Sequence, residues 1–297
     1  MTRILALIMV LIMCFSLAAC GKKGSTPSAD ATPSGEATPD AADTGSPDDS
    51  ASGTESDLSY ILDKGEMLIG YTVYEPMNYT DEEGNFTGFD TEFAIAVCEK
   101  LGVTPEFVEI VWETKEIELN TYSIDCIWNG MTITADRAAN MSISLPYVKN
   151  AQVVVIKEGS DVKTTADLIG KTVVAEIGSA GEAQIIGDDA DSNLAQANYV
   201  GLTKQTDCLL EVKAGTADAA VLDWTLAMST IGEGTDFPDL KMVEGLELAA
   251  EEYGIAFRKG SDVTEKVNEI IMELVKDGTL PALAEKYGLS LAPAIAG

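Results

Sequence analysis

Histidine is absent from the sequence, and basic residues are scarce. The 297 residues include 19 Lys and Arg against 49 Asp and Glu, which gives a formal charge of -30 at pH 7. The absence of histidine excludes Ser-His-Asp and Cys-His catalysis and the common His-containing zinc sites. An acidic surface repels nucleic-acid phosphates and anionic lipid headgroups, so we expect no nucleic-acid partner and no membrane docking through basic side chains. Small molecules or proteins are the partners that this composition favours.

Cysteine is infrequent, and its spacing carries no motif. Five cysteines occur, and no pair has the Cys-x-x-Cys spacing of redox or zinc sites. Two of them lie in the first 20 residues, so Cys98, Cys126 and Cys208 can form at most one disulfide. Each of these three lies in an apolar stretch, which favours a buried structural thiol. We expect no metal site and no cofactor.

The first 20 residues read as an export segment. Arg3 precedes an apolar run over residues 4–15, and Leu17-Ala18-Ala19-Cys20 follows with small residues before the cysteine. This ending resembles a bacterial lipobox, which implies a signal peptide over residues 1–19 and a diacylated Cys20 that anchors the exported chain to the outer face of the cell membrane. An ordinary cleaved signal and an uncleaved anchor helix are the alternatives, although the run is shorter than the roughly 20 residues of a spanning helix.

Residues 21–57 are rich in Ser, Thr, Ala, Pro, Gly and Asp, and they contain no aromatic residue and no aliphatic residue larger than Ala. Such a segment cannot bury a core. We expect residues 20–57 to form a lipidated, disordered tether.

From residue 58 onward, candidate strands and helices alternate. Expected strands cover residues 67–71, 104–111, 123–128, 152–157, 172–175 and 219–222, and expected helices cover 91–101, 113–120, 263–276 and 280–287. Asp90 is expected to cap the helix over 91–101. The alternation predicts an α/β fold with mainly parallel sheets.

Several short motifs occur in a characteristic order. They are Tyr74-Glu75-Pro76-Met77, Gly88-Phe89-Asp90, Gly130-Met131-Thr132-Ile133-Thr134 with Arg137, Gly178-Ser179, Asp218 to Asp223, and Lys276-Asp277-Gly278-Thr279-Leu280. Together they resemble extracellular solute-binding family 3, the amino-acid receptors of bacterial ABC importers. The resemblance implies a type II periplasmic-binding-protein-like fold, with lobe 1 at residues 58–149 and 252–297 and lobe 2 at 150–251. Two hinge strands would cross near 149–152 and 251–253, and the lobes would close on the ligand.

The chemistry of an amino-acid zwitterion agrees with this resemblance, since each of its charges needs a partner when it leaves water. Arg137 can engage a carboxylate with both arms of its guanidinium, and Thr134 reads as the N-cap of the helix that carries it. In the family, Thr132 donates to the ligand backbone and the Gly130 carbonyl accepts from the ammonium. Arg137 could instead be a solvated surface residue, and Thr132 an ordinary strand residue.

The second lobe is expected to contribute Ser179, Ala180 and Asp223. Ser179-Ala180-Gly181-Glu182 has the form of a capping box, and the same helix start could offer the Ser179 hydroxyl and the Ala180 amide to the carboxylate. Relatives often have a hydroxyl residue where Ala180 stands. Asp223 matches the family aspartate that pairs with the ammonium, and the alternative is a cap for the helix that starts at Trp224.

Ligand specificity is expected from four further residues. The resemblance places Tyr74 and Trp112 on either side of the ligand side chain, with Asn129 and Glu176 lining the distal pocket. Aromatic walls with a carboxylate favour a cationic side chain, or a polar amide. Trp112 could instead be a core residue, and Glu176 could lie in solvent outside the pocket.

We therefore expect a monomeric, lipid-anchored receptor that captures an α-amino acid and delivers it to a membrane permease. It is expected to have no catalytic residues. One rival is a dehydratase-like enzyme on the same fold, in which Glu176 and Asp223 do acid-base work. The other is a sensory receptor component that feeds no importer.

Overall fold

The computed structural model describes residues 56–296. The predicted signal peptide, Cys20 and nearly all of the tether lie outside this range. Within the described residues, no helix has both the length and the apolar character needed to cross a membrane.

A first five-stranded sheet has the order β4-β1-β5-β12-β6. Its strands are β1 (Glu66–Tyr71), β4 (Thr104–Glu109), β5 (Cys126–Ile127), β6 (Ser142–Ile143) and β12 (Ala256–Phe257). A second five-stranded sheet has the order β11-β7-β10-β8-β9. Its strands are β7 (Val148–Lys157), β8 (Thr172–Glu176), β9 (Asn198–Leu202), β10 (Ala219–Asp223) and β11 (Leu240–Tyr253). A hairpin of β2 (Tyr79–Thr80) and β3 (Phe86–Thr87) completes the strands of residues 56–296.

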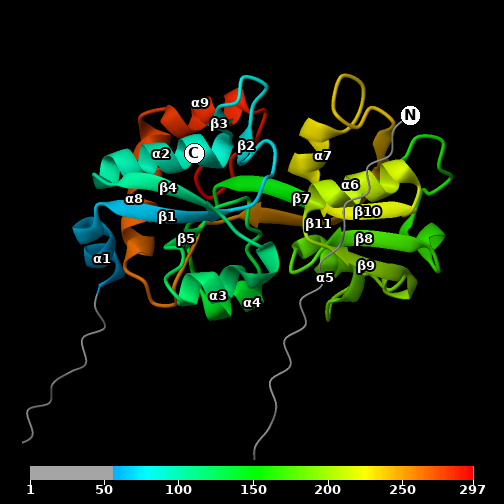
Figure 1. Cartoon of the computed structure of the whole chain (residues 1–297), viewed down its shortest axis with the longest axis horizontal. Helices are drawn as coiled ribbons and strands as arrows, with labels where there is room; N and C mark the ends of the chain where they lie inside the picture. Colours follow the sequence, from blue (N-terminus) through cyan, green and yellow to red (C-terminus); the bar gives the residue numbers. More distant parts are fainter. Residues whose placement is uncertain (1–55, 297) are drawn as a thin grey trace, which may run out of the picture. The chain divides into compact units, whose positions relative to one another are not determined.

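The two sheets form two lobes, and β7 and β11 run between them as an antiparallel pair (Figure 1). In this pair, Asn150 faces Glu251 and Val148 faces Tyr253. Each lobe contains helices on both faces of its sheet (Figure 1). The exact residues at which one lobe ends and the other begins stay a prediction.

Both sheets are mixed, which corrects the expectation of mainly parallel sheets. In the first sheet β1 runs parallel to β4 and β5, whereas β12 runs antiparallel to β5 and β6. In the second sheet β8 runs parallel to β9 and β10, whereas β7 runs antiparallel to β10 and β11. The antiparallel strands β7 and β12 enter their sheets from the other lobe, and so do not need the helical crossover that joins parallel neighbours.

The helices of the first lobe are α1 (Asp57–Lys64), α2 (Phe89–Leu101), α3 (Lys115–Asn120), α4 (Ala135–Asn140), α8 (Val263–Lys276) and α9 (Thr279–Lys286), with a short 3-10 helix η1 (Trp112–Thr114). Those of the second lobe are α5 (Ala180–Ile186), α6 (Gln205–Ala214) and α7 (Trp224–Thr230), with η2 (Thr165–Leu168) and η3 (Leu194–Gln196).

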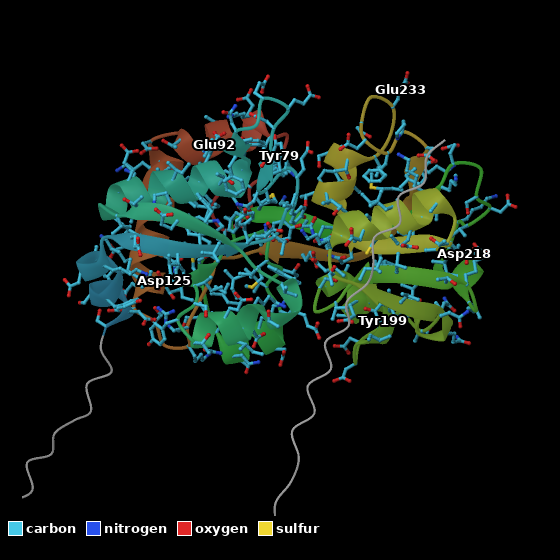
Figure 2. The ribbon with its side chains drawn as sticks, in the orientation of Figure 1. Tyr79, Glu92, Asp125, Tyr199, Asp218 and Glu233 are labelled. Carbon is cyan, nitrogen blue, oxygen red and sulfur yellow. The ribbon has the colours of Figure 1, made fainter. Side chains whose placement is uncertain are left out.

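The buried side of α8 follows directly from its sequence. Val263, Val267, Ile270, Ile271 and Leu274 recur at helical spacing, and all five are buried. By contrast, every residue of β10 is buried, as expected for a central strand covered on both faces. Exposed acids lie on the outside, such as Asp218 and Glu233 of the second lobe (Figure 2).

Asp90 does not cap a helix, contrary to the prediction. Helix α2 begins at Phe89, two residues before the expected start, and Gly88 is its N-cap. The Asp90 carboxylate is fully buried and accepts hydrogen bonds from the Gly130 amide at 2.6 Å and the Tyr147 hydroxyl at 2.9 Å. The Asp90 side chain, which the local sequence predicts to cap the helix, thus binds residues that lie far away in the sequence. Burial raises its pKa to about 7.

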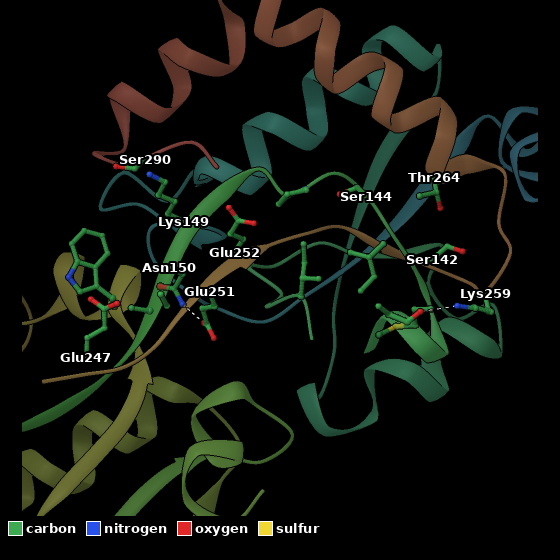
Figure 3. Close-up of a pocket in the computed structure, with 18 residues that line it drawn as sticks. Ser142, Ser144, Lys149, Asn150, Glu247, Glu251, Glu252, Lys259, Thr264 and Ser290 are labelled. Carbon is green, nitrogen blue, oxygen red and sulfur yellow. Dashed lines mark hydrogen bonds between the residues drawn. The ribbon is translucent and has the colours of Figure 1, made fainter. Parts of the chain in front are cut away.

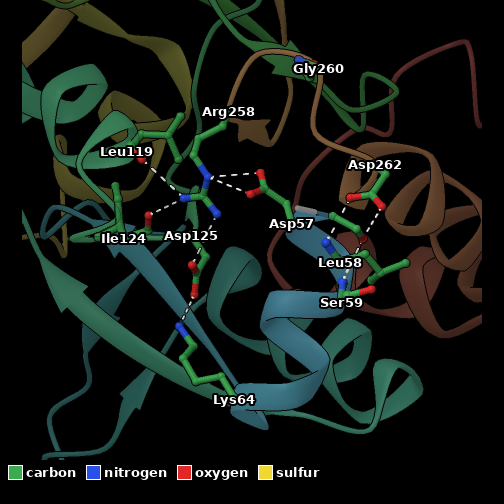
Figure 4. A network of polar contacts seen from close by, with 12 residues as sticks. Asp57, Leu58, Ser59, Lys64, Leu119, Ile124, Asp125, Arg258, Gly260 and Asp262 are labelled. Atoms are coloured by element: carbon green, nitrogen blue, oxygen red, sulfur yellow. Dashed lines mark hydrogen bonds and ion pairs between the residues drawn. The ribbon is translucent and has the colours of Figure 1, made fainter. Parts of the chain in front are cut away.

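The start of α1 is tied to the first lobe by a buried arginine (Figure 4). Arg258 Nε donates to both carboxylate oxygens of Asp57 at 3.1 and 3.0 Å, and Arg258 Nη2 lies 3.5 Å from Asp125 Oδ1. The guanidinium also lies 3.9 Å from the centre of the Tyr122 ring. This network fixes the first helix of the described chain against the lobe.

Cys98, Cys126 and Cys208 are free and buried. The expectation of buried structural thiols is therefore confirmed. Burial raises the pKa of each thiol, for Cys98 to about 12.

Candidate ligand-binding site

The carboxyl ends of the parallel strands in the two lobes meet at one small cavity. From the first lobe, the segments after β1, β4 and β5 reach this point, and from the second lobe the ends of β8 and β10 do so. Ligands of α/β proteins bind at such strand ends, because loops and helix N-termini converge there.

All ten residues predicted to contact a ligand line this cavity. They are Tyr74, Trp112, Asn129, Gly130, Thr132, Arg137, Glu176, Ser179, Ala180 and Asp223, and Gln205 lines it too. The structure thus brings the predicted residues of both lobes together, while their role in binding stays a prediction. The cavity has a volume of about 10 Å³, room for about one water molecule.

Arg137 is buried at the junction of the lobes. Its side chain is 8% exposed, so the alternative of a solvated surface arginine is wrong. Nη1 donates to the Thr132 carbonyl at 2.8 Å, and Nη2 donates across to the Gly178 carbonyl at 3.0 Å. As predicted, Thr134 caps α4, accepting from the Arg137 amide at 3.2 Å. The guanidinium has no carboxylate within salt-bridge distance among residues 56–296, and both bonds go to neutral carbonyls.

Asp223 is a buried carboxylate held by neutral donors. Oδ1 accepts from Asn150 Nδ2 at 2.5 Å, Gln152 Nε2 at 2.9 Å and the Tyr253 hydroxyl at 2.9 Å, and Oδ2 accepts from Gln205 Nε2 at 2.5 Å. Asp223 occupies the N-cap position of α7, but its side chain makes no capping bond. Burial raises its pKa, because removing the charge from water is costly. A buried acid without a cationic partner is typical of a functional site.

Glu176 ends β8 and is 3% exposed, so the alternative that places it in solvent is wrong. Burial, followed by repulsion from Asp223, raises its pKa to about 8. Lys115 lies nearby, where its ammonium donates to the carbonyls of Trp112 at 3.1 Å and Gly178 at 3.0 Å. Burial, followed by repulsion from Arg137, lowers the pKa of Lys115 to about 8.

Trp112 and Tyr74 are core residues that also line the cavity. Trp112 is 5% exposed and packs with Leu119 and Ile124, and it also lines the cavity, so both interpretations hold. The Tyr74 hydroxyl contacts the hydroxyls of Thr225 and Tyr253. Tyr74 therefore reaches from the first lobe to α7 in the second.

Asn129 and Gly130 are held in place by the protein. Asn129 Nδ2 donates to the Thr72 carbonyl and to Asn78 Oδ1, each at 2.8 Å. Gly130 has φ +56, and a Cβ there would lie 2.8 Å from Tyr74 Cε1. Only glycine combines this backbone conformation with so close an aromatic neighbour.

Ser179 acts as the predicted helix cap, accepting from the Glu182 amide at 3.0 Å at the start of α5. The reciprocal half of the capping box shifts by one residue, since Glu182 Oε2 accepts from the Gly178 amide at 2.7 Å rather than from Ser179. Thr132 forms a single bridge with Tyr253 and lies outside the named strands, unlike an ordinary strand threonine.

Sequence reasoning missed Gln205 and Glu251. Gln205 starts α6 and pairs with Asp223 through both its amide and its carbonyl. Glu251 lies on β11 and accepts from the Thr132 hydroxyl at 2.9 Å. Both are ordinary polar residues in sequence. Only their tertiary pairing brings them to the site.

A larger cavity of about 1190 Å³ lies beside the crossing strands (Figure 3). It is lined by α4, β6, the crossing parts of β7 and β11, and the start of α8. Asn150 and Glu251 line it as well, and their side chains are hydrogen-bonded to each other at 2.5 Å (Figure 3). These two residues thus join the outer cavity to the carboxylates of the inner site.

Comparison with known proteins identifies a family and similar proteins that bind amino acids. The family model for bacterial extracellular solute-binding proteins, family 3, matches residues 67–290. The L-cystine-binding protein TcyJ of Escherichia coli (strain K12) is 29% identical over 237 residues, which cover 78% of this chain and 86% of that protein.

Solved structures of similar proteins include two with a bound amino acid. An arginine-bound mutant of ArgBP from T. maritima is 36% identical, with a TM-score of 0.66, over 73% of this chain and 99% of that one. A histidine-bound substrate-binding protein of an ABC uptake transporter from Streptococcus pneumoniae is 30% identical, with a TM-score of 0.68, over 78% and 96%. The ancestral amino acid-binding protein AncCDT-1, a precursor of cyclohexadienyl dehydratase, is 29% identical, with a TM-score of 0.69, over 78% and 99%. All of these are described as binding proteins.

Proposed function

Because the chain belongs to the bacterial extracellular solute-binding proteins of family 3, we propose that it captures an α-amino acid between its two lobes and delivers it to the permease of an ABC importer. One observation carries this proposal. Arg137 and Asp223 line the same cavity from opposite lobes, and neither has an oppositely charged partner within hydrogen-bonding distance among residues 56–296. An amino-acid zwitterion would supply a carboxylate to the first and an ammonium to the second.

The charges around the cavity favour a cationic or polar ligand side chain. Glu176 is a second acid in the lining, and repulsion from Asp223 helps to keep its pKa high. A cationic side chain would relieve this repulsion, with Trp112 as an aromatic neighbour. The arginine- and histidine-bound relatives agree with this preference.

Capture requires the lobes or the lining side chains to move. A cavity of about 10 Å³ admits a water molecule but not an amino acid. The crossing pair β7 and β11 is where a hinge motion would act, which agrees with lobes at residues 58–149 with 252–297 and at 150–251. The contacts of Arg137 and Lys115 with the Gly178 carbonyl join the two lobes and would break when the lobes open.

The exported state of the protein is also part of this proposal. The lipobox-like ending at Cys20 supports removal of residues 1–19, diacylation of Cys20 and anchoring of a monomer to the outer face of the cell membrane. Labelled palmitate should enter the protein, and Cys20→Ser should abolish its incorporation. Incorporation that persists in Cys20→Ser would contradict this anchor.

The binding function is tested by thermal unfolding of the protein, freed of ligand by unfolding and refolding, against the twenty amino acids, ornithine, citrulline and cystine. An amino acid at 100 times its dissociation constant should stabilise the fold by about 2.7 kcal/mol, a shift of roughly 5–10 °C. Shifts confined to cationic and amide amino acids support the proposed preference. A shift only with apolar amino acids contradicts the preference, and no shift at all contradicts the amino-acid ligand.

A further inference from the structure

Glu251 and Asp223 are two carboxyl groups bound to the same pair of amides. Asn150 Nδ2 donates to Glu251 Oε1 at 2.5 Å and to Asp223 Oδ1 at 2.5 Å. Gln152 Nε2 donates to the same two oxygens at 2.8 and 2.9 Å. The two acidic oxygens are therefore close neighbours, one on β11 and one at the end of β10.

The groups that donate hydrogen bonds to this pair are neutral. Thr132 and Tyr253 donate hydroxyl bonds to Glu251 and Asp223 respectively, and Gln205 donates to the other oxygen of Asp223. Glu176 of β8 adds a further acid beside Asp223. On the cationic side, Arg137 of α4 attracts both carboxylates through space. Its hydrogen bonds and those of Lys115 of α3 nevertheless go to backbone carbonyls and to neither member of the pair.

Two buried carboxylates this close repel each other, and no cation among residues 56–296 lies within salt-bridge distance of either. Burial raises the pKa of both groups, and repulsion from Asp223 raises that of Glu251 further. The cluster also has a spare acceptor, because Gln152 is fully buried and its Oε1 accepts no hydrogen bond from the described residues. The pair therefore needs one positive charge or proton, and it adjoins the cavity where Asp223 lies.

We propose that Glu251 and Asp223 share one proton in the ligand-free protein and release it to solvent when the α-ammonium of an amino acid binds, which makes Glu251 a second anionic residue of the ammonium site. This inference rests on the proposed function and deepens it. The ammonium takes the place of the proton as the compensating positive charge, and no bond other than the O–H bond is broken.

The outer cavity provides the route for this proton. Glu251 lines the cavity of about 1190 Å³ beside the hinge, and its carboxyl group points to Asn150 (Figure 3). The proton can therefore pass to bulk water beside β7 and β11 while the inner cavity is closed around the amino acid.

Proton sharing has a distinctive signature in variants of the ligand-free protein. The infrared carbonyl band of protonated carboxyl groups is measured near neutral pH for the protein, Glu251→Gln, Asp223→Asn and the double variant. If one proton is shared, each single variant loses the same part of the band, because the remaining acid ionises when its acidic neighbour is gone. If one acid simply holds the proton alone, only its own substitution removes that part, which would overturn the proposal.

Proton release is measured by calorimetric titration with L-arginine and with L-cystine near pH 6.5, in buffers of different ionisation enthalpy. The dependence of the binding heat on the buffer should show release of up to about one proton. At pH values below the upper pKa of the pair, affinity should increase by up to about tenfold for each unit by which the pH is raised. Glu251→Gln should abolish proton release and make amino-acid affinity nearly independent of pH. This variant should therefore bind amino acids more tightly than the wild type at acid pH and more weakly at alkaline pH. Binding without release in the wild type would overturn the proposal.

Glu247→Gln is the matched control, since Glu247 lies on the same strand and lines the same outer cavity but is exposed. It should behave as the wild type in both measurements. If neither these nor any other amino acid binds, the proposed function fails together with the coupling to capture. The infrared comparison then still decides whether the pair shares a proton.

Discussion

The guanidinium of Arg137 donates a hydrogen bond to the backbone carbonyl of Gly178 at 3.0 Å, from the first lobe to the second. The same carbonyl accepts from Lys115 Nζ, also at 3.0 Å. Two buried cations of one lobe therefore meet a single neutral oxygen of the other. A ligand carboxylate offers a stronger, charge-assisted partner than a carbonyl, so its arrival would draw Arg137 away from Gly178.

Arg137→Lys tests the importance of the forked guanidinium. The variant keeps the positive charge but loses the paired geometry, so we expect amino-acid affinity to fall by about 10- to 100-fold, equivalent to roughly 1.5–3 kcal/mol. Calorimetric titration measures the change. Lys171→Ala, which removes an exposed cation of the second lobe, is the control and should bind normally. Equal affinities of Arg137→Lys and the wild type would show that Arg137 does not hold the carboxylate.

Glu176→Gln tests the basis of side-chain preference. The substitution keeps the shape of the side chain and removes its charge, so we expect affinity for L-arginine to fall at least about tenfold more than affinity for L-glutamine. Glu113→Gln changes an exposed acid of η1 and should alter neither affinity. Equal losses for the two amino acids would contradict a direct pairing of Glu176 with a cationic side chain.

The stability of the ligand-free protein should fall as pH rises. The pKa of Glu176 is raised to about 8 and that of Asp90 to about 7, so the folded chain holds protons that the unfolded chain has released above about pH 4.5. The stabilisation from such groups is present below their unfolded pKa and is lost as pH rises through the folded value.

We therefore expect the free energy of unfolding to decrease by on the order of 5 kcal/mol between about pH 5.5 and pH 8.5. Glu176→Gln should flatten the upper part of this change, since its amide does not ionise. Urea unfolding at several pH values measures it. A wild-type stability that is constant or rises over this window would contradict the assigned protonation of the buried acids.

The resemblance in motif order predicted a set of residues that the structure brings to one cavity, because most of them follow strand ends. Arg137, Thr132 and Gly130 follow β5, and Asp223 ends β10, so each belongs to a short motif that carries the resemblance. Glu251 could not be found in this way. Register shifts in β11 between Met242 and Glu247, and again between Glu247 and Ala249, change which residues face the partner strand. Simple alternation along a strand does not predict the direction of a side chain beyond such bulges.

The fold was predictable at the level of elements and less so at the level of pairing. Helix α8 spans the expected residues 263–276, because its apolar spacing leaves one choice of buried face. The antiparallel entry of β7 and β12 depends on the chain crossing between lobes, which no local pattern records. Asp90 likewise has the local form of a cap, while its actual partner, Gly130, lies 40 residues away.

Gly130→Ala tests the close approach at the cavity wall. The new Cβ would lie 2.8 Å from Tyr74 Cε1 and 3.1 Å from Tyr253 Cε2, in a left-handed backbone conformation. We expect a loss of about 2–4 kcal/mol in the free energy of unfolding, with weakened amino-acid binding. Gly102→Ala has a similar positive φ with nothing within 4 Å of the new Cβ, so it should cost only about 1 kcal/mol. Equal losses of stability in the two variants would show that the cost of Gly130→Ala comes from backbone strain alone and not from the close contact with Tyr74.

Arg258→Ala separates stability from binding. Arg258 compensates Asp57 and Asp125, and Asp125 is 1% exposed (Figure 4). Its removal leaves the buried Asp125 carboxylate with Lys64 as its one remaining cationic partner among residues 56–296, at 2.6 Å. It also removes bonds to the carbonyls of Leu119 and Ile124. We expect the free energy of unfolding to fall by about 3–5 kcal/mol in urea titrations.

Amino-acid affinity of the folded Arg258→Ala protein should not change, because Arg258 does not line the inner cavity. Lys266→Ala removes an exposed ion pair with Glu269 and should alter stability by no more than about 0.5 kcal/mol. The loss of stability in Arg258→Lys should lie between those of Arg258→Ala and Lys266→Ala, since lysine keeps the positive charge but not the forked hydrogen bonds. If Arg258→Ala unfolds at the same urea concentration as Lys266→Ala, the Arg258 network contributes nothing to stability. If the folded Arg258→Ala protein binds amino acids more weakly than the wild type, Arg258 influences the site through the first lobe.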